Sequence, residues 1–358
     1  MTILLFIVIL AFLILSHEFG HFIIAKKSGI RVEEFGLGFP PRLYGIKKGD
    51  TLYSINLIPF GGFVKIEGEE GEHPNDPKSF AAKPAYIKAA VLVAGVAFNL
   101  LSAYLLFAVI SWAGTPTNIG DENPPGVRDV QVLVGSVDAA SPASDAGLVV
   151  GDSIIRASAN NQSVDIQTIS DLQIFIEDRK GEIIDITLLR GENEETIPIF
   201  ARANPPPQEG PLGISLLRVG IVKSPWYEAL WDGFVMLGRS MLLVVSGFYD
   251  IIRIALAGED TSAYLAGPIG IVGLVGQSLD LGFLFLLQFT AILAVHLAII
   301  NLVPFPALDG GRLFFLFIET IIRRPLPRTF TNYANTLGFF FLIGLMLLIT
   351  VADVKKLF

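Results

Sequence analysis

The chain has 358 residues, of which 52% are hydrophobic and 17% are charged, and its formal net charge is −8. This apolar balance predicts several membrane spans, and the acidic charge argues against a nucleic-acid partner, because phosphate binding requires a basic surface. The sequence contains no cysteine, which excludes disulfides, thiolate metal sites and a cysteine nucleophile. Any metal ion must therefore be held by His, Asp, Glu or Asn side chains.

Four regions contain stretches that are long and apolar enough to span a membrane. Residues 1–28 come first, and we expect a retained span there, because a signal peptide has a shorter apolar core and a basic start. The other spans are expected in residues 89–113, 281–311 and 312–358, the last one following a cytoplasmic connection. Charged residues interrupt the apolar pattern of 226–258, which favours an amphipathic helix there over a fifth span.

The distribution of basic residues predicts how the spans are oriented. Lysine and arginine are frequent in 29–88 and again between the last two spans, whereas 114–225 is rich in Asp and Glu. The positive-inside rule then places both basic connections in the cytoplasm and the acidic segment outside. Lys355 and Lys356 are the one dissenting signal, and we expect a multi-pass protein of the inner membrane.

Two regions between the spans have strand-like patterns. Residues 29–88 alternate around turn residues, which predicts β-hairpins, and the sequence alone favours a cytoplasmic sheet. Residues 127–200 alternate like strands and are interrupted by a helical pattern over 168–179, and a Pro-rich linker follows at 204–211. The segment 114–225 is therefore expected to contain a small β-rich soluble domain.

The first span contains the sequence HEFGH, which puts His17, Glu18 and His21 inside an apolar run. Ionisable side chains at membrane depth are costly and usually face a cavity, a partner or an ion. Histidines four residues apart on a helix lie on one face, so both imidazoles can bind one metal ion, with Glu18 as a general base for water. The alternative is a pair of histidines that hydrogen-bond to neighbouring helices, and this alternative leaves Glu18 unexplained.

A catalytic zinc ion needs a third protein ligand and one open position. His73 lies in a charged loop and is better explained as a solvated residue, and His296 lies within a span where it can hydrogen-bond to a neighbouring helix. Asp309, in NLVPFPALDGGR, is the better candidate. The alternative for Asp309 is a helix or turn cap before the following pair of glycines.

Pro304 and Pro306 support this choice, because each must break the third span. A broken helix at membrane depth is tolerated where it is packed in protein or lines a watery cavity. The break places Asp309 near the cytoplasmic end of its span, which is the depth expected for His17 and His21.

HEFGH in a first span, NLVPFPALDGG after a later one and a domain between them resemble the bacterial site-2 proteases, a family of intramembrane zinc metalloproteases. The resemblance covers essentially the whole chain. It implies one Zn²⁺ per chain with Glu18 as the catalytic base, and the implied metal ligands are His17, His21 and Asp309.

The same resemblance implies substrate-binding residues. Asn301 is expected to hold the substrate backbone or the hydrated intermediate, and GVAFN at 95–99 matches a G-x-x-x-N pattern of the family that gives Asn99 a substrate role. Close helix packing explains Gly95 equally well. The family also has a re-entrant β-hairpin that offers a strand edge to extended substrate, and the residues expected at this edge are Gly61, Gly62 and Phe63.

SPASDAGLVVGDSII, at 141–155, resembles the helix-turn-strand signature of PDZ domains. In permuted bacterial PDZ domains the peptide-binding loop and strand come from the end of the domain, where this chain has PLGISL at 211–216. The resemblance implies that backbone N–H groups of Leu212, Gly213 and Ile214 bind a peptide C-terminus. The alternative is that PLGISL is only a closing strand.

The expected fold is a multi-span α-helical membrane protein with about four transmembrane helices, a membrane-associated β-hairpin region and an inserted α+β PDZ domain. The expected function is intramembrane zinc endopeptidase activity on single-span membrane proteins in the lipid bilayer, after an earlier extracytoplasmic cut. A non-proteolytic PDZ scaffold and a metal transporter are the alternatives. A structural zinc site would need a fourth ligand, and transporters usually show repeat symmetry.

Overall fold

The computed structural model describes residues 1–358 except 70, 122–126, 192, 207–208, 260–264 and 357–358, so that two residues of the expected linker lie outside the described part. The chain forms two units. The first unit contains Met1–Phe107, Gly233–Val275 and Phe289–Phe358, and the second contains Ala108–Asp232 and Gly276–Gln288.

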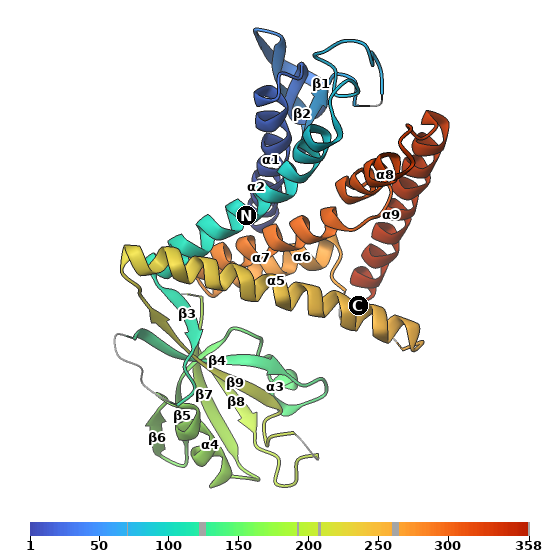
Figure 1. Cartoon of the computed structure of the whole chain (residues 1–358). Helices are drawn as coiled ribbons and strands as arrows, with labels where there is room; N and C mark the ends of the chain where they lie inside the picture. The colour runs from blue at the N-terminus through green and yellow to red at the C-terminus, as the bar shows by residue number, and fades with distance from the viewer. Residues whose placement is uncertain (70, 122–126, 192, 207–208, 260–264, 357–358) are drawn as a thin grey trace. The chain divides into compact units, whose positions relative to one another are not determined.

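Five of the described helices are long and apolar enough to cross a membrane (Figure 1). They are α1 (Thr2–Lys27), α2 (Ala85–Ala113), α5 (Trp226–Leu256), α7 (Phe283–Leu302) and α9 (Arg328–Lys356). Four of these correspond to the predicted spans. The exception is α5, for which the sequence favoured an amphipathic helix over a fifth span, so the structure offers five candidate spans instead of four.

The predicted break after the third span is confirmed. Helix α7 ends at Leu302, and after six intervening residues a new helix, α8 (Asp309–Ile322), starts with Leu308 as its N-cap residue. Helix α7 thus ends before residue 311, the last residue of the expected span, because the two prolines at 304 and 306 cannot continue the helix. A short helix, α6 (Pro268–Asp280), precedes α7.

The predicted β-hairpin region is confirmed as a sheet of two long antiparallel strands, β1 (Val32–Lys48) and β2 (Thr51–Ile66). The strands are joined at Gly49 and Asp50, and Gly49 has φ +64°, which glycine adopts without strain. Phe35 of β1 pairs with both Val64 and Tyr53, so the two ends of β2 flank the first half of β1.

One end of this sheet is packed against α1 and α2. A cluster of buried side chains joins the four elements, and its members are Phe22, Ala25, Ile30, Val32, Ile66, Phe80, Val91 and Leu92. The other end carries exposed apolar side chains, including Phe39, Leu43, Tyr44 and Leu57. Large exposed apolar surface of this kind suits contact with lipid.

The second unit contains a sheet in the strand order β3-β9-β4-β5-β7-β8, with β6 paired to β5. The strands are β3 (Thr115–Asn118), β4 (Arg128–Val137), β5 (Ser153–Ala159), β6 (Gln162–Asp165), β7 (Ile183–Arg190), β8 (Asn193–Phe200) and β9 (Ile214–Val222). Two short helices accompany them, α3 (Pro142–Asp145) and α4 (Ile169–Glu177). The strand and helix patterns predicted over 127–200 are therefore confirmed.

An ion pair with a buried carboxylate supports the core of this sheet. The carboxylate of Asp152 is 1% exposed and accepts hydrogen bonds from Nε and Nη2 of Arg190, at 2.8 and 2.7 Å. It also accepts one from the backbone N–H of Val149, at 3.0 Å. By contrast, Arg156 and Asp165 form a pair in which both side chains are more than half exposed.

We predict that Asp152→Ala lowers the free energy of unfolding of this domain by about 1–3 kcal/mol, because the N–H of Val149 and the guanidinium of Arg190 would lose a buried acceptor. Arg190 would keep its contacts with Glu195 and with the carbonyl oxygen of Gly147. Asp165→Ala is the matched control and should cost much less, since water screens an exposed pair. Hydrogen exchange of the strand amides in the full-length protein measures both changes. Equal losses in the two variants would contradict the prediction.

Candidate active site

Helix α1 places His17 and His21 side by side, because residues four apart lie on the same face of a helix. Their Nε2 atoms are 3.2 Å apart, and the rings meet edge to face with centroids separated by 4.7 Å. The Nδ1 atom of His21 lies 2.8 Å from the carbonyl oxygen of Val91 on α2. A carbonyl only accepts, so Nδ1 carries the proton of a neutral His21 and Nε2 has the lone pair.

Asp309 reaches the histidines because it is the first residue of α8. The connection before it folds back tightly, and Gly310 and Gly311 permit this: a Cβ atom at either position would overlap the backbone of residues 302–305. Ala307 has φ +75°, an uncommon conformation for a residue with a side chain. Its backbone N–H donates to Oδ1 of Asn335 on α9, at 3.1 Å, which helps to hold this conformation.

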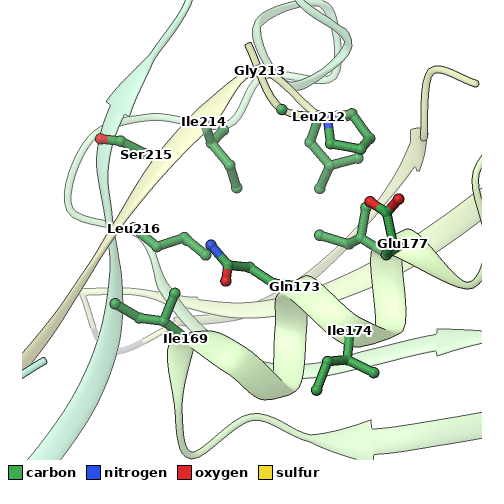
Figure 2. A pocket seen from close by; sticks show the side chains of 12 residues that line it. Ile169, Gln173, Ile174, Glu177, Leu212, Gly213, Ile214, Ser215 and Leu216 are labelled. Carbon is green, nitrogen blue, oxygen red and sulfur yellow. The ribbon is translucent and has the colours of Figure 1, made fainter. Parts of the chain in front are cut away.

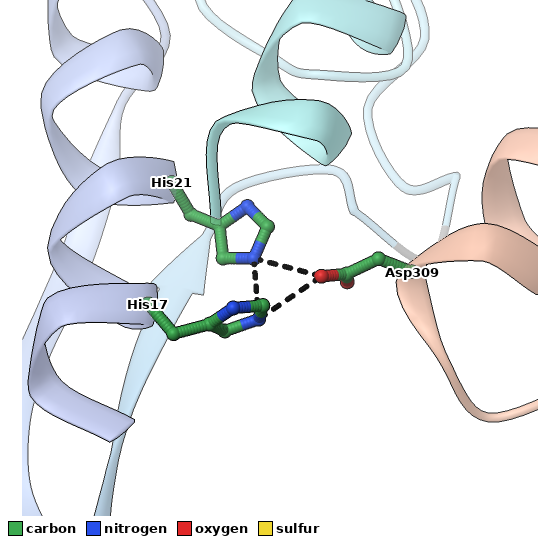
Figure 3. Close-up of side chains that lie close together, drawn as sticks. All are labelled: His17, His21 and Asp309. Atoms are coloured by element: carbon green, nitrogen blue, oxygen red, sulfur yellow. Dashed lines mark hydrogen bonds and ion pairs between the residues drawn. The ribbon is translucent and has the colours of Figure 1, made fainter. Parts of the chain in front are cut away.

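Three potential ligand atoms converge in this way (Figure 3). The Oδ2 atom of Asp309 lies 3.0 Å from Nε2 of His17 and 3.2 Å from Nε2 of His21. This oxygen is buried, and neither contact has the direction of a hydrogen bond. The three atoms form a nearly equilateral triangle, and the ligands of a tetrahedral zinc ion are separated by about 3.3 Å. A divalent cation would satisfy all three atoms together, so the residues fit a metal.

Helix α2 comes close to the imidazoles because residue 95 is glycine. A Cβ atom at Gly95 would lie 2.6 Å from Cε1 of His17 and closer still to Nε2 of His21. The approach is mutual, since a Cβ atom at Gly20 of α1 would overlap the backbone of Ala94. The small residue in GVAFN therefore serves close helix packing, which the sequence analysis left as one of two explanations.

Two further predicted residues lie next to this cluster. Glu18 is partly buried, and its Oε2 atom accepts a hydrogen bond from the backbone N–H of Val64 in β2, at 3.0 Å. Asn99 is 1% exposed, and its Nδ2 atom lies 3.5 Å from Nδ1 of His17. The contact with Val64 has no signature in the sequence, because it is made by a backbone group 46 residues away.

The residues expected to hold substrate are more dispersed. Gly61 and Gly62 are buried against Ile14 and Leu15 of α1, as the contacts of a Cβ atom at each glycine show. Phe63 stacks on Phe39, with ring centroids 6.3 Å apart. A different element carries the remaining residue, Asn301, which is partly buried one residue before the end of α7.

The other two histidines of the chain lie outside the cluster. His73 is in an exposed loop, and its Nδ1 atom lies 3.4 Å from Oε1 of Glu67. His296 is in α7, where Nδ1 lies 2.9 Å from the carbonyl oxygen of Ile292 and the ring packs against Phe248. The exposed position of His73 agrees with the explanation given to it. His296 bonds to a carbonyl of its own helix instead of a neighbouring helix, and its ring contacts Phe248 of α5.

The second unit contains a groove of about 590 Å³ between β9 and α4 (Figure 2). Leu212, Gly213 and Ile214 line one end, and Gln173 and Glu177 of α4 face them. Strand β9 pairs with β4 on one edge, whereas β3 covers the other edge only from Val219 onward. Among the described residues, no strand therefore occupies the β9 edge at Ile214–Leu217.

Comparison with known proteins agrees with these features. The sequence model of peptidase family M50 matches residues 5–345. A protein of Clostridium perfringens, provisionally named a zinc metalloprotease, is 34% identical over 342 residues, which cover 96% of this chain and 95% of that protein. A Nostoc protein with the same provisional name is 35% identical over 367 residues, covering 100% of this chain and 97% of the relative.

A relative with a specific name is the regulator of sigma-W protease RasP of Bacillus subtilis. It is 25% identical over 438 residues, which cover 100% of this chain and 99% of RasP. The match to the family extends over nearly the whole chain, including both segments that form the histidine–aspartate cluster. The chain therefore belongs to peptidase family M50 and is a zinc metalloendopeptidase of the site-2 protease type.

Proposed function

We propose that this protein cleaves the transmembrane segments of single-span membrane proteins, with zinc held by His17, His21 and Asp309. The convergence of their three ligand atoms within 3.0–3.2 Å carries this proposal. Among the described residues the group contains three potential ligands, which is the number of a catalytic zinc site, whereas a structural site has four. This count favours an enzyme over a scaffold with a structural metal.

Zinc, when bound, supplies Lewis-acid polarisation of a peptide carbonyl and of water at this site. Glu18 is the proposed general base: its carboxylate takes a proton from the attacking water and later gives it to the nitrogen of the leaving amine. The hydrogen bond from Val64 restrains the carboxylate on the side of the sheet. The ionisable side chains of α1 and α8 would therefore act at a site that lies between apolar helices.

The substrate is proposed to bind as an extended strand beside β2, near Gly61, Gly62 and Phe63, with Asn301 holding its backbone. Strand addition satisfies the N–H and C=O groups of an unwound substrate helix, which would be costly to leave unpaired in lipid. The two glycines are buried against α1, so α1 and β2 must separate slightly to admit a strand.

The second unit is proposed to be a PDZ domain on the outer side of the inner membrane. Its groove supports this assignment, since an open strand edge beside a helix is where an extended peptide adds to a sheet. Leu212, Gly213 and Ile214 are the proposed site for a peptide C-terminus, which an earlier outer cut would create. The active site is proposed to lie near the cytoplasmic side, where the basic residues are concentrated.

We predict that Glu18→Gln abolishes cleavage of a single-span protein in reconstituted bilayers, with a loss of about 10²–10⁴-fold or more, because the amide cannot accept the proton. Zinc content should stay unchanged. Glu33→Gln is the control, since Glu33 lies on the sheet and pairs with Lys65. If Glu18→Gln cleaved the same peptide bonds at the wild-type rate, Glu18 would be excluded as the base.

We predict that Asp309→Asn weakens zinc binding by at least about tenfold, because a neutral amide replaces an anionic ligand. Competition with a chromophoric chelator measures the affinity in the purified full-length protein. Asp50→Asn is the control, since Asp50 lies in the exposed β1–β2 turn. Wild-type affinity in Asp309→Asn would show that the third ligand is another group.

Gly95→Ala tests the helix contact. The added methyl group would occupy space held by the two imidazoles, so we expect zinc affinity and cleavage to fall at least about tenfold. Gly247→Ala in α5 is the matched control, because no atom lies within 4 Å of the added Cβ there, and both properties should stay within about twofold. Equal behaviour of the two variants would contradict the packing account.

A further inference from the structure

Asn99 is a polar side chain to which the proposed mechanism assigns no step. It is 1% exposed in the apolar helix α2, and its Oδ1 atom is buried without a hydrogen-bond partner. Burying an amide oxygen without a partner destabilises the folded protein. Its Nδ2 atom lies 3.5 Å from Nδ1 of His17, so one amide atom faces the imidazole while the other is unpaired.

The chemistry of His17 decides which amide atom belongs beside Nδ1. Nε2 of His17 faces Oδ2 of Asp309 and must offer a lone pair there to serve as a metal ligand. The proton of the neutral ring is then on Nδ1, which needs an acceptor. Half a turn of the Asn99 amide exchanges Nδ2 for Oδ1, and the assignment of these two atoms follows from the hydrogen bonds they make. This rotation pairs Oδ1 of Asn99 with the Nδ1–H of His17 and moves the amide nitrogen to the position that Oδ1 held.

His21 shows the same arrangement with a different acceptor. Its Nδ1 atom lies 2.8 Å from the carbonyl oxygen of Val91, which also belongs to α2. Gly95 lies midway between Val91 and Asn99 and lets the helix approach both rings. Metal-binding histidines usually donate their other N–H to an oxygen, which fixes the tautomer and the ring orientation.

We propose that Asn99 is a positioning residue whose side-chain oxygen accepts the Nδ1–H of His17 and so directs Nε2 of His17 toward the metal. This inference rests on the proposed metal site and differs from the substrate-binding role that the resemblance implied for Asn99. Helix α2 would then supply one acceptor for each histidine: a backbone carbonyl for His21 and a side-chain amide for His17.

The test is the zinc dissociation constant of the full-length protein in detergent, measured by competition with a chromophoric chelator. Asn99→Leu has similar size but no acceptor, and we expect zinc to bind about 10–100-fold more weakly. Asn99→Asp keeps the acceptor and should bind zinc within about threefold of the wild type. Ser102→Ala is the packing control: it removes the 2.6 Å contact with Ser16 between α1 and α2 without touching His17, and should change affinity less than twofold.

The outcomes separate the two roles of Asn99. Weak binding in Asn99→Leu with retained binding in Asn99→Asp supports the positioning role. Unchanged zinc affinity in Asn99→Leu together with a raised KM for cleavage overturns this role in favour of substrate binding. Failure of the wild type to bind zinc, or wild-type affinity in His17→Ala, overturns the proposed metal site itself, which is a different result.

A second measurement uses no variant at Asn99, so its result does not depend on whether such a variant folds. Nitrogen-15 NMR of histidine-labelled, zinc-loaded protein in bilayers reports which ring nitrogen of His17 is protonated, with His17→Ala used to assign the signal. A protonated Nδ1 of His17 supports the inference. An unprotonated Nδ1 would overturn it.

Discussion

The need to satisfy polar groups in an apolar setting is the constraint on which the rest of this structure depends. Two imidazoles and a carboxylate meet between helices that are otherwise apolar, and each such group costs free energy unless it has a partner. A shared cation would satisfy the three inward atoms, and the carbonyl oxygen of Val91 on α2 is an acceptor for the outward nitrogen of His21. A site for peptide hydrolysis explains why ionisable residues are present in a membrane helix despite their cost. Contacts between helices alone would not explain them.

The fold meets this constraint in two ways: residue spacing within a helix aligns side chains, and glycines let separate backbone segments approach closely. Helix spacing alone aligns His17 with His21, whereas Asp309 is brought in by a chain reversal between α7 and α8. That reversal depends on glycines at 310 and 311, which admit backbone where a side chain would clash. Gly95 does the same for α2. The site is thus built on rigid elements, which suits the positional accuracy that catalysis demands.

The parts predictable from the sequence are those encoded by local patterns. The helix of HEFGH, the break at Pro304 and Pro306, the β-hairpin region and the strands of the second unit each have a periodicity or a breaker residue of their own. The sequence favoured an amphipathic helix for α5, whereas its length and composition also suit a span, because its charges are spread over 31 residues. Contacts such as Val64 with Glu18 and Asn335 with Ala307 were out of reach, because they pair a backbone group with a distant side chain and leave no pattern in either segment.

The central claim is that zinc is held by two imidazoles and one carboxylate, and X-ray absorption at the zinc edge of the purified full-length protein tests it most directly. The account predicts one zinc per chain with two imidazole ligands and oxygen atoms completing the shell at about 2.0–2.2 Å. The oxygen contribution should change in a protein whose Asp309 is replaced. A third imidazole around the metal, supplied by His73 or His296, would contradict the account, as would a spectrum indifferent to residue 309.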